Sequence, residues 1–234
     1  MAVIEKRKIM MKANYLIRVL MCLILGMFVS IASAGEIGTL VNFVGKVTLI
    51  KADGSSVPAK IKAPVNEGDT LVTEKGAFAM FKYIDGGEMI LKPDTQVQMK
   101  QYKFVDTDPF ADKSEINVVK GGLRRLTGLI GKRGDKDADK LVTSTATAGI
   151  RGTIYDVVVC KGDCDKLADG VYFKVKEGEI VIKNDAGAVS LKAGQYSYVK
   201  SSDSLPVILP KDPGLPTMNP PKTMQNSPNA GCEV

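Results

Sequence analysis

The predicted fold is organised around the stretch TSTATAGIRGT at residues 143–153. Small and β-branched side chains fill most of it, and the apolar run from Ile154 to Val159 follows directly. Such residues favour a β-strand, and their small side chains let a second backbone approach closely. Gly149 and Gly152 flank Arg151, so we expect a bulge or a bend beside this arginine.

Arg151 stands among small and apolar residues. If it is buried, its guanidinium needs carboxylate or carbonyl partners, because an unpaired buried charge costs several kcal/mol. One hypothesis is a contact with an anion or a partner. The other, which we favour, is a buried tie between strands. The second hypothesis predicts that Arg151→Ala lowers stability before it affects binding.

The rest of the chain repeats a pattern of short apolar segments separated by glycine-containing turns. Residues 96–102 alternate, with Val97 and Met99 on one face. Asp85-Gly86-Gly87 predicts a hairpin, since glycine reaches the positive φ angles of tight turns. This pattern predicts an all-β fold of many short antiparallel strands, either a sandwich or a β-solenoid-like stack.

A weak internal repeat leaves these two architectures open. Residues 45–51 (GKVTLIK) resemble residues 178–183 (GEIVIK), and another glycine follows each segment. Two copies are too few to establish a solenoid, and the common pattern of hairpins produces the same match. Internal duplication is therefore a hypothesis at this stage.

The first 34 residues have the organisation of a secretory signal peptide. Five basic residues precede the apolar run 19–31, and Ala32-Ser33-Ala34 supplies a cleavage site. The run is shorter than the roughly 20 residues that span a bilayer. We therefore expect cleavage near Ala34 and export to the periplasm or beyond, with membrane attachment only if the segment is not cleaved.

Three segments follow from composition: a signal peptide at 1–34, a β domain at 35–200 and a Pro-rich disordered tail at 201–234. The tail holds seven of the eleven prolines. Removing residues 1–34 leaves 27 basic and 25 acidic residues, so the formal charge falls from +6 to +2. The basic precursor is therefore poor evidence for nucleic-acid binding, and no nucleic-acid partner is expected.

Two cysteines lie close together, at Cys160 and Cys164. In an oxidising compartment this spacing favours a structural disulfide. The alternative is a redox or metal-binding C-x-x-x-C motif, which is weakened by the complete lack of histidine. Cys232 in the tail is left without an expected partner, as a free or intermolecular thiol.

The sequence lacks the residues of most catalytic centres. Without histidine, Ser-His-Asp and Cys-His catalysis and His-based zinc sites are excluded. We find no phosphate-binding loop and no dinucleotide fingerprint. We expect no enzyme activity, no cofactor and no metal, with a carboxylate-based hydrolase as the remaining alternative.

Two polar segments, 106–115 and 131–140, are predicted to be exposed loops. In the second, Asp135, Asp137 and Asp139 resemble the opening of a calcium loop, but the glycine and glutamate that such a loop requires are missing, so we favour a solvated loop. Arg124 and Arg125 are predicted to be solvated on a strand edge.

The ordered set of motifs resembles the FecR-like domain family, exported β domains named after a periplasmic regulator of ferric-citrate uptake. The resemblance covers residues 38–199. It includes NEGDTLVT at 66–73, LKPDT at 91–95, GGLR at 121–124, KEGEI at 176–180, and a hallmark whose key residues are Thr145, Gly149, Arg151, Gly152 and Thr153. The resemblance implies an all-β exported module and supplies no catalytic residues.

In the regulators that gave the family its name, the periplasmic domain senses a receptor and a cytoplasmic segment controls a sigma factor. Fewer than about 20 residues precede the apolar run here, too few for a control domain. We therefore predict a stand-alone non-catalytic module that interacts with a protein or an envelope glycan, with signal sensing as one form of this role. The alternative is a structural cell-envelope component without a soluble ligand, whose tail is a spacer.

Overall fold

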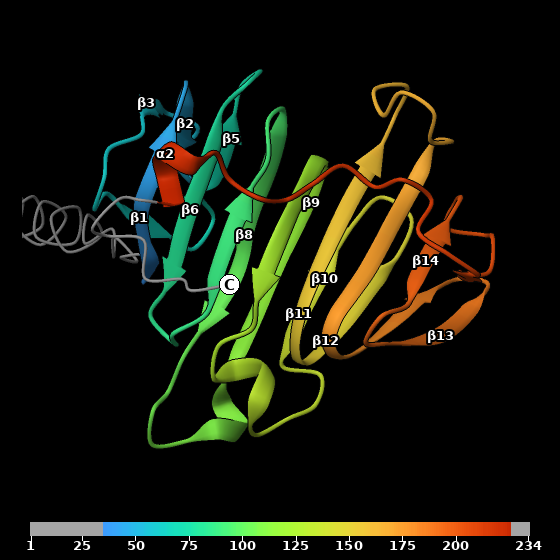
Figure 1. Cartoon of the computed structure of the whole chain (residues 1–234). Coiled ribbons are helices and arrows are strands. Elements are labelled where there is room, and N and C mark those ends of the chain that lie inside the picture. Colours follow the sequence, from blue (N-terminus) through green and yellow to red (C-terminus); the bar gives the residue numbers. More distant parts are fainter. Residues whose placement is uncertain (1–34, 226–234) are drawn as a thin grey trace, which may run out of the picture. The chain divides into compact units, whose positions relative to one another are not determined.

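The computed structural model describes residues 35–225, and the account below concerns only these (Figure 1). The predicted signal peptide, residues 1–34, and the final residues 226–234, including Cys232, lie outside this range. Among the described residues no helix is long and apolar enough to cross a membrane. The elements are β1 (Glu36–Val44), β2 (Val47–Ile50), β3 (Ser56–Pro58), β4 (Pro64–Asn66), β5 (Thr70–Thr73), β6 (Phe78–Tyr83), β7 (Glu88–Leu91), β8 (Thr95–Lys103), η1 (Pro109–Ala111), β9 (Lys113–Leu126), η2 (Ile130–Lys132), β10 (Asp139–Val142), β11 (Thr147–Cys160), β12 (Gly170–Asn184), β13 (Gly187–Lys192), β14 (Tyr196–Val199), β15 (Val207–Leu209) and the short helix α2 (Lys222–Gln225).

The fifteen strands of this region form one hydrogen-bonded sheet that divides into two ladders. Ladder I contains, in order, β4, β1, β6, β7, the second half of β9, the second half of β11, the first half of β12, β14 and β15. Ladder II contains, in order, β3, β2, β5, β8, the first half of β9, β10, the first half of β11, the second half of β12 and β13. The long strands β9, β11 and β12 therefore belong to both ladders.

Each of these three strands changes ladder at a glycine with positive φ. These glycines are Gly121 (φ +78°), Gly152 (φ +58°) and Gly178 (φ +78°). A side chain at Gly178 would overlap the carbonyl oxygen of Gly152, so the bends of β11 and β12 are packed against each other. Only glycine reaches this backbone region without strain and leaves room for such an approach. The bend expected beside Arg151 is confirmed at Gly152.

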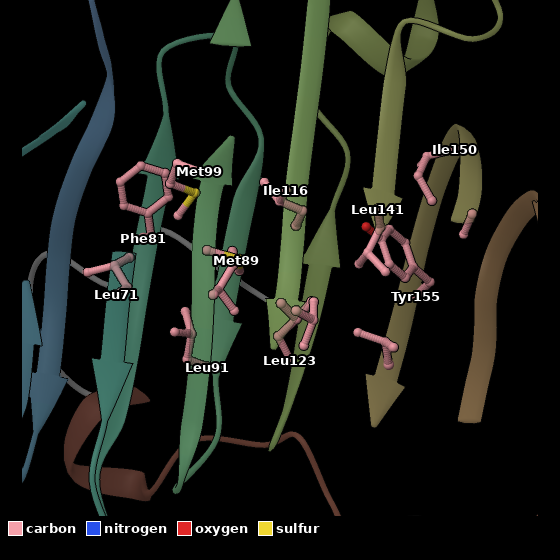
Figure 2. Close-up of a cluster of buried hydrophobic side chains, with 14 of the residues drawn as sticks. Leu71, Phe81, Met89, Leu91, Met99, Ile116, Leu123, Leu141, Ile150 and Tyr155 are labelled. Atoms are coloured by element: carbon pink, nitrogen blue, oxygen red, sulfur yellow. The ribbon is translucent and has the colours of Figure 1, made fainter. Parts of the chain in front are cut away.

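The main core consists of inward-facing side chains from both ladders (Figure 2). Ladder I contributes Phe81, Met89, Leu91, Leu123 and Tyr155, and ladder II contributes Leu71, Met99, Ile116, Leu141 and Ile150. All of them are almost completely buried. Tyr83 of β6 stacks on Tyr102 of β8 with ring centroids 5.7 Å apart, which is a direct contact between the ladders. Burial of apolar area between the ladders is the main stabilising contribution.

The predicted all-β class is confirmed, with two differences in detail. The shared strands are 14 and 15 residues long and not short, because the glycine bends let one strand continue into a second ladder. The sheet is also mixed, since β10 pairs with β9 in parallel. The resembling segments at 45–51 and 178–183 form hairpins at opposite edges of ladder II, β2–β3 and β12–β13.

The tail at 201–234 was predicted to be disordered, but its described part, residues 201–225, is ordered against the sheet. Residues 207–209 form β15, which pairs with β14, and Met218 and Met224 are buried. In Figure 1 the segment after β15 crosses ladder I and returns to α2 beside β1. The proline content suggested a chain that could not bury apolar surface. Single apolar side chains along the segment do so by contacting the sheet.

Candidate interaction surface

The structure contradicts the expected burial of Arg151. Its side chain is exposed, and it has no ion pair or hydrogen bond among the described residues. Its neighbours Ala148 and Ile150 are buried, so the alternation of β11 turns Arg151 outward, opposite Glu179 of β12. The hypothesis of a buried tie was wrong.

The other hallmark residues shape the bend of β11. Thr153 is buried, and its carbonyl oxygen accepts hydrogen bonds from the backbone and hydroxyl of Thr127 at 3.0 and 2.8 Å. Gly149 lies half-buried on ladder II, and Thr145 lies in the turn before β11. The hallmark residues do not converge on one site. Their contacts stabilise the bend of β11.

A different arginine forms the buried tie. Arg125 of β9 is 1% exposed, and its Nη1 lies 2.7 Å from Oδ1 of Asp139 in β10. Its Nη2 donates to the hydroxyl of Ser114 at 3.0 Å. Arg125 belongs to ladder I, whereas Asp139 and Ser114 belong to ladder II, so the pair crosses the core. The predicted solvation of Arg125 and of Asp139 was therefore wrong.

Arg124 points the other way and pairs with Asp156 of β11. Its Nε and Nη2 lie 2.7 and 2.9 Å from the two carboxylate oxygens, and Nη1 donates to Asn219 Oδ1 at 3.0 Å. Such a two-point contact fixes the guanidinium in its plane. Both arginines predicted to be solvated are thus engaged, on opposite faces of β9.

Three tyrosines lie around the Arg125–Asp139 pair. The Arg125 guanidinium carbon lies 4.8 Å from the ring centre of Tyr83. Burial raises the pKa of Tyr83 to about 12, although nearby Arg125 opposes the shift. Burial likewise raises the pKa of Tyr102 and of Tyr155. The same loss of hydration raises the pKa of Asp139, against the opposing effect of Arg125.

These tyrosines predict alkaline unfolding. The unfolded chain releases their protons near pH 10, whereas the folded protein holds them to higher pH. Because the pKa of these tyrosines is higher in the folded protein, they contribute fully to stability below pH 10. This contribution is lost as the pH rises above 10. Each such tyrosine lowers the unfolding free energy by about 1.4 kcal/mol per pH unit. Phenolate absorbance and circular dichroism should change together; phenolate formation at pH 10.5 by all tyrosines in a fully folded protein would contradict this.

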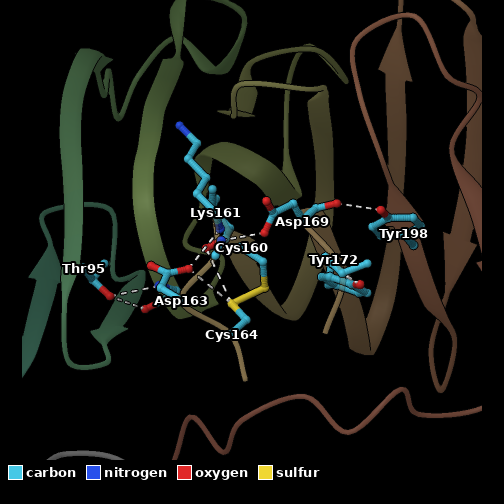
Figure 3. The surroundings of a disulfide bond; sticks show 12 residues. Thr95, Cys160, Lys161, Asp163, Cys164, Asp169, Tyr172 and Tyr198 are labelled. Atoms are coloured by element: carbon cyan, nitrogen blue, oxygen red, sulfur yellow. Dashed lines mark hydrogen bonds between the residues drawn. A yellow bond between two sulfur atoms is a disulfide. The ribbon is translucent and has the colours of Figure 1, made fainter. Parts of the chain in front are cut away.

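The predicted disulfide between Cys160 and Cys164 is present (Figure 3). It closes the start of the β11–β12 connection, which is also fastened by hydrogen bonds. The hydroxyl of Tyr198 donates to the carbonyl of Asp169 at 2.6 Å, and the backbone of Lys161 donates to Asp163 Oδ1 at 2.9 Å. The contacts of this loop are structural ones.

One end of the strands carries a set of joined loops that we call the loop end: the β6–β7 turn 84–87 and the segments 104–112 and 127–134. Asp85 is 4% exposed, and it joins the turn 84–87 to the segment 127–134. Its carboxylate accepts from the backbone of Gly87 at 3.0 Å and of Ile130 at 3.2 Å, and its carbonyl accepts from Leu129 at 3.0 Å. A side chain at Gly128 would overlap this carboxylate.

Arg133 joins the segment 127–134 to the segment 104–112. Its Nε lies 3.0 Å from Asp112 Oδ2, and its Nη2 donates to the carbonyl of Val105 at 3.0 Å. Its guanidinium also lies 4.8 Å from the ring centre of Phe104. Arg133 is thus fully engaged, which leaves the Arg-Gly-Asp tripeptide at 133–135 without a free arginine. Engaged side chains of this kind hold loops in one conformation.

On these fastened loops stand three large exposed apolar side chains. Phe110 in η1 is 78% exposed, Ile84 is 50% exposed and Leu129 is 44% exposed. Aromatic side chains are enriched in protein interfaces, and a preorganised surface lowers the entropy cost of binding. The sequence predicted residues 106–115 as a polar exposed loop, and neither Phe110 within it nor Ile84 and Leu129 outside it was predicted to be an exposed apolar group. The one available signal was Pro109-Phe110 within an otherwise charged segment.

The candidate calcium loop has no corresponding site. Asp139 is paired inside the core, and Asp135 accepts a hydrogen bond from the backbone of Asp137 at 3.0 Å. Within residues 35–225 no group of three or more cysteine, aspartate or glutamate side chains is placed to hold a metal ion.

No protein-family model matches the sequence, and no curated protein matches it. Two crystal structures of a candidate anti-sigma factor from Parabacteroides distasonis align with part of this chain, with 12% and 13% sequence identity and a TM-score of 0.46 in each case. Each alignment covers 61% of this chain and 60% of that chain. A cell surface anchoring domain aligns at 24% identity with a TM-score of 0.27, over 28% of this chain and 87% of that chain. Likeness at this level does not assign a function, and membership of the FecR-like family stays a prediction.

Proposed function

We propose that this protein is an exported, non-catalytic β module that binds a partner protein of the cell envelope through its loop end. The observation that carries the proposal is the exposure of Phe110, Ile84 and Leu129 on loops that Asp85 and Arg133 hold in place. When a partner covers exposed apolar side chains, the removal of their surface from water lowers the free energy of the complex. Their fixed positions also reduce the entropy lost on binding.

The surroundings of the carboxylates support a non-catalytic role. Five aspartates are buried among the described residues, and each is engaged with a cation or with backbone N–H groups. They are Asp69 with Lys51 and two backbone groups, Asp85 with the loop end, Asp112 with Arg133, Asp139 with Arg125, and Asp156 with Arg124. Carboxylates that are paired in this way fit a structural role. Hydrolysis would need two carboxyl groups that face the substrate.

A protein partner is favoured over a glycan by the chemistry of the loop end. Its large exposed apolar side chains are one phenylalanine and two aliphatic groups, and exposed Asp106, Thr107, Asp108 and Lys132 lie on the same loops. Such apolar groups fill apolar pockets of a protein surface. Recognition of a glycan depends on hydroxyl-directed hydrogen bonds, which Phe110, Ile84 and Leu129 cannot make, so the three apolar side chains on which the proposal rests favour a protein.

Crosslinking in the native cell tests the proposal. A photoreactive amino acid at position 110 should capture one envelope protein in a stoichiometric complex. Phe110→Ala in the purified protein should weaken binding of that partner by about 30-fold, the loss expected for a central interface residue. Its unfolding free energy should stay within about 0.5 kcal/mol of the original, because the ring is exposed.

Ile61→Ala is the matched control, because Ile61 is 49% exposed but lies outside the loop end. It should leave partner binding unchanged. Equal crosslinking from positions 61 and 110 would contradict the proposal. Sedimentation of the protein with purified cell wall, without a captured protein, would instead support the structural envelope component.

A further inference from the structure

Among the described strands, each ladder has two edge strands: β4 and β15 in ladder I, and β3 and β13 in ladder II. An edge strand turns alternate N–H and C=O groups away from its partner, so a further strand can pair with them. Proline has no N–H to offer, and it occupies or flanks three of these edges, as Pro58 in β3, Pro64 in β4, and Pro206 and Pro210 around β15. At the β4 edge the N–H of Asn66 also donates to Asp69 at 2.9 Å. These three edges are therefore protected against pairing.

The edge of β13 has no such protection. The strand is six residues long and contains no proline. Where β13 ends, the N–H of Ala193 donates to the carbonyl of Gly178 at 3.1 Å, and the alternation that starts from this bond turns the backbone groups of Ala188 and Ser190 away from β12. Both residues are exposed, and outside the pairing of β13 with β12 neither backbone takes part in a hydrogen bond within residues 35–225. The edge thus offers two N–H and two C=O groups to a further strand.

A group of exposed apolar side chains lies beside this open edge. Leu205 is 59% exposed, Val207 is 52% exposed and Ile208 is 41% exposed. They belong to β15 and the loop before it, and β15 lies next to β13. A carbon added at Gly187, the first residue of β13, would lie 2.6 Å from Cδ2 of Leu205. In Figure 1 β13 and β14 lie at the end of the sheet that is opposite β1. Exposed apolar groups beside an open sheet edge are typical of a site of association.

The open edge is complementary to a second copy of itself. If two β13 strands run antiparallel with Val189 on a two-fold axis, Ala188 lies opposite Ser190 of the second copy, and Ser190 lies opposite Ala188. All four residues turn their backbone groups toward the other copy, so the two pairs can form four hydrogen bonds. The same register places exposed Lys192 beside exposed Asp185 in the hairpin turn of the second copy, where the two opposite charges attract each other.

We propose that β13 is the interface of a symmetric dimer, in which the β13 strands of two copies pair antiparallel and ladder II continues from one copy into the other. Leu205, Val207 and Ile208 of each copy lie beside the paired strands, and the contact removes their apolar surface from water. The self-complementary register and charges favour a second copy over a different protein, because a two-fold axis requires one surface to fit itself. β13 is not part of the loop end, so this proposal does not depend on the proposed function.

Sedimentation equilibrium of the purified protein tests the dimer. The protein should show a monomer–dimer equilibrium, and Ser190→Pro should raise the dissociation constant at least 10-fold, because proline has no N–H for the pairing. The circular dichroism of the variant should not change, since this N–H points away from β12. If the variant does not fold, Val207→Lys places a charge from each copy at the contact without changing the core, and it should weaken the dimer to the same extent. Val57→Lys is the matched control, because Val57 is 41% exposed on the protected edge strand β3. It should leave the dimer unchanged.

A charge exchange tests the antiparallel register. In low-salt buffer Asp185→Lys or Lys192→Asp alone should weaken the dimer at least 2-fold, and the two together should restore it. The proposal is overturned if the protein stays monomeric up to about 100 μM, or if the dimer keeps its affinity in both Ser190→Pro and Val207→Lys. Phe110→Ala should leave the dimer intact. Loss of the dimer in this variant would place self-association at the loop end and would also overturn the β13 interface.

Discussion

Replacing Asp139 by alanine is expected to lower the unfolding free energy by about 3–5 kcal/mol, which is the range for removing one member of a buried ion pair. Arg125 would keep its charge in the core without a carboxylate partner, beside the hydroxyl of Ser114 and the ring of Tyr83. Urea unfolding followed by circular dichroism measures the loss. A change below 1 kcal/mol would show that the pair does not tie the two ladders.

Two further variants isolate the reason for this loss. Asp137→Ala removes an exposed carboxylate two residues away and should change stability by no more than about 0.5 kcal/mol. The combination of Arg125→Met and Asp139→Leu removes both charges and should recover most of the loss, since apolar replacement of a whole buried pair is often neutral.

Arg151→Ala should change the unfolding free energy little, because the side chain is exposed, in contrast to the first expectation from the sequence.

Replacing Gly178 by alanine is expected to lower the unfolding free energy by about 3 kcal/mol or more. At φ +78° an alanine carries a strain of about 1–2 kcal/mol. The added carbon would also overlap the carbonyl oxygen of Gly152 and lie 2.7 Å from Thr153 Cγ2. Because both obstacles belong to the bend of β11, the two shared strands would have to separate where they change ladder.

Gly194 is a matched control for the strain that alanine has at a positive φ angle. Its φ is +80°, nearly the same, but an added carbon there has no neighbouring atom within 4 Å. Gly194→Ala should therefore show only the conformational strain, and the difference between the two variants measures the packing of the bends. Equal losses in urea unfolding would mean that the close approach at Gly178 contributes nothing.

Much of the fold followed from local patterns in the sequence. Asp85-Gly86-Gly87 does form the β6–β7 hairpin, and the alternation of residues 96–102 is that of β8. The disulfide followed from the spacing of its cysteines. The three long strands did not follow, because a glycine that bends a strand into a second ladder has the same local signature as a glycine that ends it.

The buried arginine shows a second limit. Arg151 was expected inside because its neighbours are small, yet strand alternation with Ile150 turns it outward. The same parity places Arg125 on the face of Leu123, which is buried. Its partner Asp139 comes from a highly charged segment, and only the tertiary pairing of β9 with β10 brings the two together. Exposed apolar groups such as Phe110 were equally hidden, since exposure is not a property of local sequence.

The sharing of β9, β11 and β12 by both ladders has a mechanical consequence. In a two-sheet protein whose strands each stay in one sheet, a pulling force can peel one sheet away while the other stays intact. Here three continuous backbones pass from one ladder to the other, so tension applied to either is carried along covalent bonds into its neighbour. When the domain is stretched, it should therefore rupture in a single event.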